Sequence, residues 1–239
     1  MKCFDHTFSS PAENLAADEA LLDWAESGNG GESLRFWESP QPFVVVGYAN
    51  QVATEVNAAA CEARKIPILR RCSGGGTVVQ GPGCLNYSLV LPITQDGPLH
   101  SISVANQFIM RRNRAAIETL MNKPVAIRGH TDLAVGEMKF SGNSQRRRQK
   151  FLLFHGTTLL NLDLALVGEL LQMPSKQPHY RENRAHTAFL TNIGVAAGEV
   201  KAALRKAWAA ESPLTNPPLE ITKKLAREKY STNEWNFKF

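Results

Sequence analysis

Three consecutive glycines, preceded by two arginines and a serine, form the segment of this sequence best suited to bind an anion. The segment reads Arg70-Arg71-Cys72-Ser73-Gly74-Gly75-Gly76. Consecutive glycines cost backbone entropy on folding, and a turn without side chains lets amide N–H groups approach a phosphate or carboxylate closely. The arginines would add charged donors for the same anion. A tight β-turn with solvent-facing arginines is the alternative interpretation.

The glycine turn matches neither of the two common nucleotide-binding motifs. Gly76 and Gly81 have the spacing of a P-loop, but Pro82 stands where that motif has its lysine. A dinucleotide fingerprint would place a third glycine at Val79 and continue into a helix. The pattern therefore indicates an anion site of another kind.

Lys139 is the second candidate, in a short apolar strand expected over 138–141. A hydroxyl, a glycine and an amide follow in Ser141-Gly142-Asn143, and Arg146 comes shortly after. A lysine in such a strand can simply face solvent. The polar groups that follow it favour a pocket for a negatively charged group.

His155 is the third candidate, in a strand expected over 151–160 and followed by Gly156 and Thr157. A histidine in an apolar strand is most often a structural residue whose ring nitrogens are satisfied by its neighbours. Contact with a ligand is the alternative.

Helices and strands alternate along the chain without a strict βαβ rhythm, which predicts an α/β (α+β) fold with a mixed sheet flanked by helices. Ser10, Pro11 and Glu13 predict a capped start for the first helix, and Gly28 ends it. Strands over 34–38 and 43–46 are expected to pair like a hairpin. Further helices are predicted over 103–121, 162–171, 196–210 and 218–229, with a polar loop over 172–190.

Composition excludes several classes of protein. The 239 residues include 27 Lys+Arg against 22 Asp+Glu, a net charge of +5 that is too mild to predict nucleic-acid binding. The four cysteines form no C-x-x-C pair, so neither a zinc site nor a disulfide framework is expected. Neither a signal peptide nor an apolar stretch of about 18 residues is present. We expect a single cytoplasmic domain over 1–239, with no contact with a membrane.

Taken together, these motifs give the sequence a resemblance to the lipoate–protein ligase A family, in the biotin/lipoate protein ligase superfamily. The matching segments, in chain order, are Asn14-x-x-x-Asp18-Glu19-x-Leu21-Leu22, Phe36-Trp37 through Val46-Gly47-x-x-x-Gln51, Arg70-Arg71-x-Ser73-Gly74-Gly75-Gly76, Gly83-x-Leu85-Asn86, Lys139-x-Ser141-Gly142-Asn143-x-Gln145-Arg146, His155-Gly156-Thr157-x-Leu159-Leu160 and Lys229-Tyr230-Ser231-x-x-Glu234-Trp235-Asn236. They span nearly the whole chain and are specific in combination.

The resemblance implies a catalytic domain related to biotin ligases and class II synthetase cores. It implies activation of lipoate or octanoate with Mg-ATP to an acyl-AMP, followed by transfer of the acyl group to a lysine of a lipoyl carrier domain. Such carriers belong to 2-oxoacid dehydrogenases or are the glycine cleavage H protein. Many of these ligases have a C-terminal accessory domain. This chain ends without one, so a separate accessory protein is a further expected partner.

The resemblance also assigns roles to residues of this sequence. Lys139 matches the lysine that contacts both the acyl carbonyl and the phosphate, and is the expected catalytic residue. Asp132 falls where these ligases hold an acidic residue near nucleotide and Mg²⁺, although Thr131 replaces the usual asparagine before it. The expected binding residues are Arg70, Ser73, Gly74, Gly75, Gly76, Asn86, Asp132, Ser141, Gly142, Arg146, His155, Gly156 and Thr157.

Two other functions stay open beside the ligase. The octanoyltransferases of the family transfer an acyl group from a carrier protein without ATP, and they need a cysteine nucleophile near the lysine. Here no cysteine follows Cys84, which speaks against thioester chemistry; Cys84 itself is a weak candidate. The third possibility is a non-catalytic protein that binds lipoyl carriers. The basic run 146–150 is a candidate docking surface for such a carrier, or simply a solvated loop.

Overall fold

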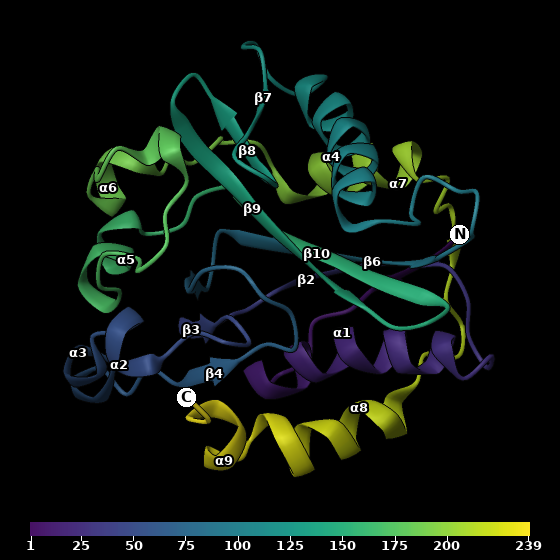
Figure 1. Ribbon diagram of the computed structural model, residues 1–239, viewed down its shortest axis with the longest axis horizontal. Helices are drawn as coiled ribbons and strands as arrows, with labels where there is room; N and C mark the ends of the chain where they lie inside the picture. The colour runs from purple at the N-terminus through teal and green to yellow at the C-terminus, as the bar shows by residue number, and fades with distance from the viewer.

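The computed structural model describes residues 1–239 and is built around an eight-stranded mixed sheet. Its strand order is β11-β1-β2-β6-β10-β9-β8-β7, and a second sheet has the order β4-β3-β5. In the large sheet, β1 runs parallel to both β2 and β11, while all other neighbours are antiparallel. The mixed sheet with flanking helices is therefore confirmed (Figure 1).

The large sheet contains β1 (Lys2–Asp5), β2 (Ser33–Glu38), β6 (Cys84–Pro92), β7 (Ala126–Arg128), β8 (Asp132–Val135), β9 (Met138–Arg147), β10 (Phe151–Leu159) and β11 (Ser212–Pro213); the small one contains β3 (Phe43–Val46), β4 (Ile68–Arg70) and β5 (Val78–Gln80). The helices are α1 (Pro11–Glu26), α2 (Val52–Glu55), α3 (Ala58–Ala63), α4 (Ile102–Glu118), α5 (Leu164–Leu170), α6 (His186–Phe189), α7 (Ala197–Ala207), α8 (Leu219–Leu225) and α9 (Asn233–Asn236), with helical turns η1 (His179–Arg181) and η2 (Ala226–Tyr230). None of the helices combines the length and apolar character needed to cross a bilayer.

One face of the large sheet, here called the α4 face, forms the largest apolar core. Leu152 and Phe154 of β10 point to this face, because alternate residues of a strand share a face. They pack with Ile109 and Met110 of α4 and Leu204 of α7. Figure 1 shows α4 and α7 together on this side of the sheet.

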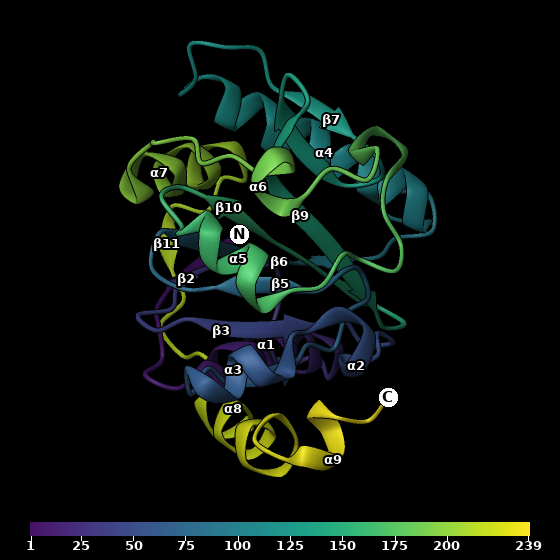
Figure 2. The ribbon, with the colours of Figure 1, turned by 90° about the vertical axis from the view of Figure 1, so that its left-hand side faces the viewer.

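The opposite face, here called the α1 face, is covered by α1 and approached by the small sheet. Leu153 of β10 and Val90 of β6 pack there against Leu21 and Leu22 of α1. Figure 2 shows the small sheet and α1 between the large sheet and the C-terminal helices α8 and α9. The α1 face also carries polar residues of β6 and β10, and these form the candidate site.

Two expectations about local structure were wrong. The strands over 34–38 and 43–46 do not pair, since β2 lies between β1 and β6 while β3 belongs to the small sheet. The linker between them contains Pro40 and Pro42, which lack N–H groups for a hairpin ladder. Helix α1 begins as predicted, but Ser10 makes no side-chain cap bond. Instead, the Asn14 amide donates to the carbonyl oxygens of Phe8 and Ser10.

Candidate active site

The strand register brings separate motifs of the sequence into one row on the sheet. Thr157 of β10 stands opposite Asn86 of β6 and Gly142 of β9, and Gly142 stands opposite Asp132 of β8. Two residues before Thr157 on the same strand, His155 stands between Ser88 of β6 and Ser144 of β9. Residues two apart on a strand share a face, so the two rows form a continuous polar surface.

Lys139 is paired with a carboxylate in this structure. Its Nζ lies 2.8 Å from Asp132 Oδ1, and the Tyr180 hydroxyl donates to Asp132 Oδ2 at 2.8 Å. The side chains of Lys139 and Asp132 are 24% and 13% exposed, so solvent and ligands can reach the pair. Gly142 makes this geometry possible, because a Cβ there would lie 2.9 Å from Lys139 Nζ. The predicted neighbours Asp132, Lys139 and Gly142 therefore do come together.

Sequence reasoning missed Tyr180. It belongs to η1, inside the segment expected to be a polar loop, and no local pattern linked it to Asp132. Burial and the adjacent Asp132 carboxylate raise the pKa of Tyr180 well above its ordinary value. The phenol therefore stays protonated and acts as a hydrogen-bond donor to Asp132.

The glycine turn is organised by Arg71. Its Nη2 donates to the carbonyl oxygens of Gly74 and Gly76 at 2.6 and 2.7 Å. Burial lowers the pKa of Arg71 to about 10, which still leaves the guanidinium charged at neutral pH. Gly75 has φ +86°, a conformation that a residue with a side chain adopts only with strain. The N–H groups of Gly74, Gly75 and Gly76 donate to no protein group, so they are available to an anion.

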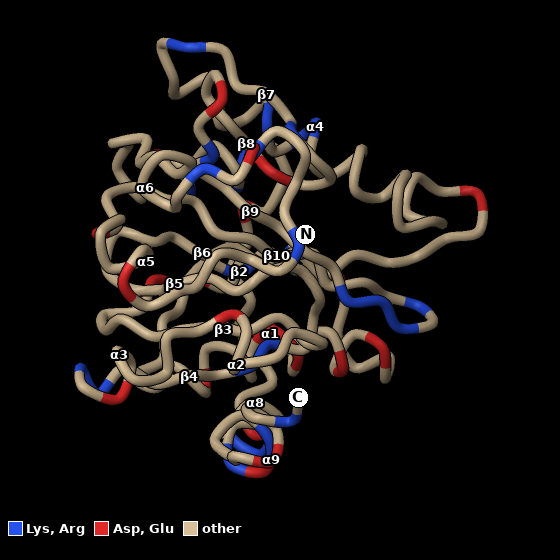
Figure 3. The backbone as a smooth tube through the Cα atoms, turned by 60° about the vertical axis from the view of Figure 1, so that its left-hand side comes forward, with Lys and Arg blue, Asp and Glu red and all other residues tan.

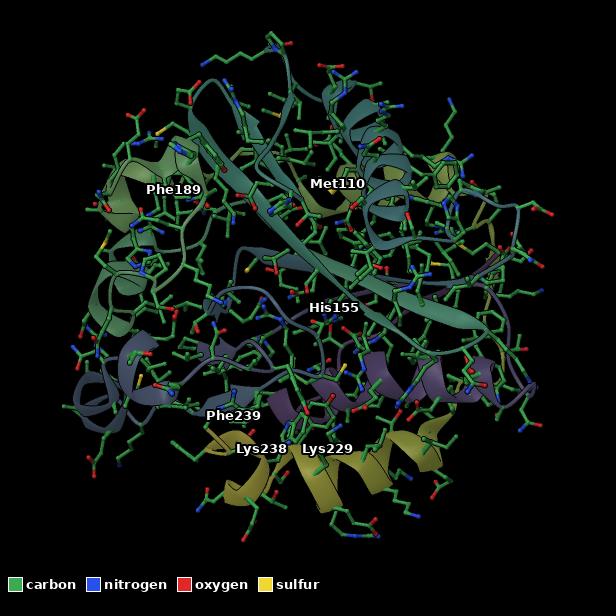
Figure 4. The ribbon with its side chains drawn as sticks, in the orientation of Figure 1. Met110, His155, Phe189, Lys229, Lys238 and Phe239 are labelled. Carbon is green, nitrogen blue, oxygen red and sulfur yellow. The ribbon has the colours of Figure 1, made fainter.

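Arg70 has a structural role instead of offering free donors to a ligand. Its Nη1 donates to the carbonyls of Gly47, Tyr48 and Asn50, and its Nε and Nη2 donate to those of Trp235 and Asn236. All three nitrogens are thus engaged, and the residue fastens the C-terminal segment to the loop after β3. In Figure 4, Phe239 and Lys238 of that segment lie beside β4 and α9, away from the labelled His155.

The Arg146 side chain makes no hydrogen bond within the protein. Its guanidinium lies over the Tyr48 ring, and its buried Nε has no acceptor. Burial of an N–H group without an acceptor is costly, and an anionic ligand would supply the missing partner of Nε. The predicted binding role of Arg146 agrees with this placement.

Ser73, His155, Asp18 and Arg35 form one buried chain of polar contacts. His155 Nε2 lies 2.5 Å from Ser73 Oγ, and His155 Nδ1 lies 2.9 Å from Asp18 Oδ2. Asp18 Oδ1 in turn lies 2.5 Å from Arg35 Nη1. Burial disfavours the Asp18 carboxylate, but Arg35 and His155 outweigh it and hold its pKa below the ordinary value. Asp18 was not predicted as a site residue; the signal was its position in the first helix, in a motif shared with the family.

The remaining predicted residues divide between polar clusters and packing. Asn86 and Thr157 are bonded to each other and share Gln80 as a partner, at 2.8 Å in each case. Ser141 is buried and accepts a bond from Asn143. Gly156 has a packing role, because a Cβ there would lie 1.7 Å from the Asn143 amide oxygen.

All four cysteines are buried and free. Burial raises the pKa of Cys72 to about 12 and that of Cys84 further. Burial also raises the pKa values of Cys3 and Cys61. A thiol is nucleophilic only as a thiolate, so none of these cysteines is prepared to accept an acyl group at neutral pH.

The residues provide one candidate ligand for a metal ion. No group of three His, Cys, Asp or Glu side chains gathers as a metal site anywhere in the structure. Mg²⁺ in nucleotide sites uses one or two carboxylates together with substrate phosphates, so Asp132 could supply a single ligand. Both Asp132 oxygens already have partners, Lys139 and Tyr180, and Mg²⁺ would have to displace one of them.

Part of the basic run 146–150 is used within the protein. Arg147 donates to the carbonyls of Leu99 and His100, and Arg148 pairs with Asp23. Basic and acidic positions are interspersed along the backbone in Figure 3. Docking of a carrier on this run stays a prediction, with fewer free charges than the sequence suggested.

Comparison with known proteins identifies the family. Residues 10–208 match the model of the lipoyl protein ligase A/B catalytic domain, and the chain belongs to this family. A curated relative, the octanoyltransferase LipM of Geobacillus kaustophilus, is 27% identical over 98% of this chain and 96% of its own length. The chain is thus a member of an enzyme family, and this relative is named as an octanoyltransferase.

Two solved structures share the fold. A lipoate-protein ligase A crystallised with ATP has a TM-score of 0.83, with 24% identity over 99% of this chain and 98% of its own. The second comes from a study of a bi-partite lipoate protein ligase and its E2 lipoyl domain from Thermoplasma acidophilum. It has a TM-score of 0.81, with 22% identity over 99% and 95% of the two chains.

Proposed function

We propose that this protein is an ATP-dependent lipoate–protein ligase, which forms an acyl-AMP from lipoate or octanoate and transfers the acyl group to a lysine of a lipoyl carrier domain. The observation that carries the proposal is the accessible Lys139 beside Asp132, in a site whose cysteines are all buried thiols. A transferase that used cysteine would need a reachable thiolate near the lysine.

Joining a carboxylate to the α-phosphate of ATP brings two anions together, so the site must provide fixed positive charge. Lys139 would leave Asp132 and place its ammonium group between the acyl carboxylate and the phosphate. Arg146, whose buried Nε has no acceptor in the protein, would donate to the same ligand. Asp132, once released, could hold Mg²⁺, which would neutralise phosphate charge when bound.

The N–H groups of the glycine turn, which have no protein acceptor, would donate to the same ligand. The open space beside Gly74 and Gly76, where an added Cβ would meet no atom within 4 Å, leaves room for an acyl-adenylate. The small residues in this turn are then required by the ligand and not only by the backbone conformation.

The proposed acceptor is the lysine of a lipoyl carrier domain, in a 2-oxoacid dehydrogenase or the glycine cleavage H protein. A separate accessory protein is the second proposed partner, since the Thermoplasma ligase of similar fold is described as bi-partite. The isolated chain is then expected to transfer from preformed acyl-AMP, and to form acyl-AMP slowly without its partner.

Incubation with ATP, Mg²⁺ and lipoate or octanoate, followed by mass spectrometry for acyl-AMP, tests the proposal. Lys139→Met should lose the product, whereas Lys223→Met, which removes an exposed lysine on α8, should form it at the rate of the unmodified protein. Ligation to a carrier that proceeds only from an acyl thioester, with no acyl-AMP under any condition, would favour the octanoyltransferase activity for which the Geobacillus relative is named. Carrier binding with neither reaction would indicate a non-catalytic protein.

A further inference from the structure

The buried chain from Ser73 to Arg35 has an arrangement that binding of an adenylate does not require. Ser73 and His155 are 1% and 9% exposed, and four elements contribute to the chain: the glycine turn, β10, α1 and β2. Figure 4 places His155 at the centre of the molecule, between β10 and α1. A serine bonded to a histidine that is oriented by a buried carboxylate is the arrangement that activates a hydroxyl nucleophile.

The contact with Asp18 defines the tautomer of a neutral His155 ring. The ionised Asp18 can only accept, so His155 Nδ1 must carry a proton and donate it at 2.9 Å. The Arg71 guanidinium donates its Nε–H to Ser73 Oγ at 3.2 Å. When the His155 ring is neutral, its Nε2 has no proton, and the Ser73 hydroxyl can donate to it across the 2.5 Å contact. His155 is thus in the tautomer that removes a proton from Ser73.

Donors for a developing oxyanion stand next to this serine. The N–H groups of Gly74, Gly75 and Gly76 have no protein acceptor. The carbonyl oxygens of Gly74 and Gly76 are held by Arg71, which fixes the orientation of the peptide planes. An added Cβ at Gly74 or Gly76 would meet no atom within 4 Å, so the space beside these two glycines is open.

We propose that Ser73 is an acyl acceptor, with His155 as its general base and Asp18 as the residue that orients His155. The activity goes beyond ligation with ATP: it transfers a medium-chain acyl group from a thioester to a carrier lysine through a serine ester. This route would give a member of a family that includes octanoyltransferases a nucleophile other than cysteine. Because Ser73 is 1% exposed, its hydroxyl must turn toward the open space beside Gly74 and Gly76 to accept the acyl group.

The two steps balance without any further reactant. Ser73 Oγ attacks the thioester carbonyl carbon and its proton moves to His155 Nε2; the C–S bond then breaks, and the leaving thiolate takes that proton. In the second step the neutral amine of the acceptor lysine attacks the ester carbonyl. The C–N bond forms, the C–Oγ bond breaks, and a proton of the amine returns through His155 to Ser73.

The test uses the full chain with the octanoyl thioester of N-acetylcysteamine and no ATP. We expect a mass increase of one octanoyl group, located by peptide mapping on Ser73 and stable to neutral hydroxylamine, which cleaves thioesters. Ser73→Ala should abolish the adduct and lower ATP-free transfer to a carrier lysine by about 10³-fold or more. Ser73→Cys should move the acyl group to a hydroxylamine-sensitive thioester, which keeps the test informative if Ser73→Ala folds poorly.

Two variants serve as controls. Ser144→Ala removes a hydroxyl that also touches the glycine turn, through a 2.9 Å bond to Gly74, but that is not bonded to His155. Cys72→Ala removes the thiol adjacent to Ser73. Both should retain the adduct. Absence of an adduct on the unmodified protein, while ATP-dependent ligation proceeds, would overturn this inference and leave the proposed ligase intact. An adduct that is lost with Cys72→Ala would overturn it as well.

Discussion

Replacing Lys139 with methionine separates a catalytic role from a structural one, because we expect a small loss of stability and a larger loss of transition-state stabilisation. The side chains of the Lys139–Asp132 pair are 24% and 13% exposed, and the Tyr180 hydroxyl continues to donate to Asp132 in the variant. Exposed pairs contribute about 1 kcal/mol or less, whereas removing one partner of a fully buried pair costs about 3–5 kcal/mol. Methionine retains most of the apolar stem of lysine, and Asp132 keeps the Tyr180 hydroxyl as a partner. For this partly buried pair we therefore expect the free energy of unfolding to fall by about 1–2 kcal/mol.

The expected effect on catalysis is larger. Loss of one donor aimed at developing charge lowers a rate by about 10²–10³, equivalent to about 2.7–4 kcal/mol. The two quantities would be measured by denaturant unfolding and by the rate of acyl-AMP formation under saturating ATP and octanoate. A folded variant that forms acyl-AMP at nearly the unmodified rate would refute the role of Lys139. A loss of activity matched by an equally large loss of stability would indicate that the pair is structural.

Three further predictions concern the surroundings of Lys139. Gly75→Val places a side chain at φ +86° and within 2.9 Å of Arg71 Nη2, so binding of lipoyl-AMP, measured by calorimetry, should be lost with only a moderate drop in stability; normal binding would make the turn merely structural. Asp18→Asn leaves Arg35 buried without its charge partner and should lower the free energy of unfolding by about 3–5 kcal/mol at pH 7. Because the pKa of Asp18 is lowered in the folded protein, the stability difference between the two proteins should be fully present above about pH 4, the pKa of the unfolded chain. It should shrink as the pH falls through the folded pKa. A stability difference that does not change with pH would contradict this assignment. The four cysteines should resist iodoacetamide in the native protein at pH 8 and react on unfolding, as counted by mass spectrometry, and rapid native alkylation of Cys72 or Cys84 would reopen thioester chemistry.

The amino-acid sequence alone predicted the mixed sheet and most of its elements, because local patterns encode them. Leu152 and Phe154 of β10 alternate with residues that include His155, and this alternation specifies that Leu152 and Phe154 meet the α4 core while His155 faces the other way. Pairing between distant strands is not a local property. The wrong hairpin of β2 and β3 shows this, since strands that are adjacent in the chain joined different sheets.

The motif residues were predictable as a group, but their individual contacts were not. Arg70 and Arg71 look alike in sequence, yet Arg70 fastens the C-terminal segment and Arg71 holds the glycine turn. Their different roles depend on where the chain returns after more than 150 residues. The contact of Tyr180 with Asp132 depends in the same way on a segment whose own sequence has no periodic pattern.

The measurement that tests the central claim most directly is a comparison of two acyl sources with one carrier. The purified chain would be given a lipoyl carrier domain with either presynthesised lipoyl-AMP or lipoate, ATP and Mg²⁺, and lipoylation of the carrier lysine followed by mass spectrometry. Ligase chemistry at Lys139 predicts rapid transfer from lipoyl-AMP that Lys139→Met slows strongly, and slower product formation from lipoate and ATP. A chain that transfers from neither source, while the carrier is lipoylated by an active control ligase, would contradict the account.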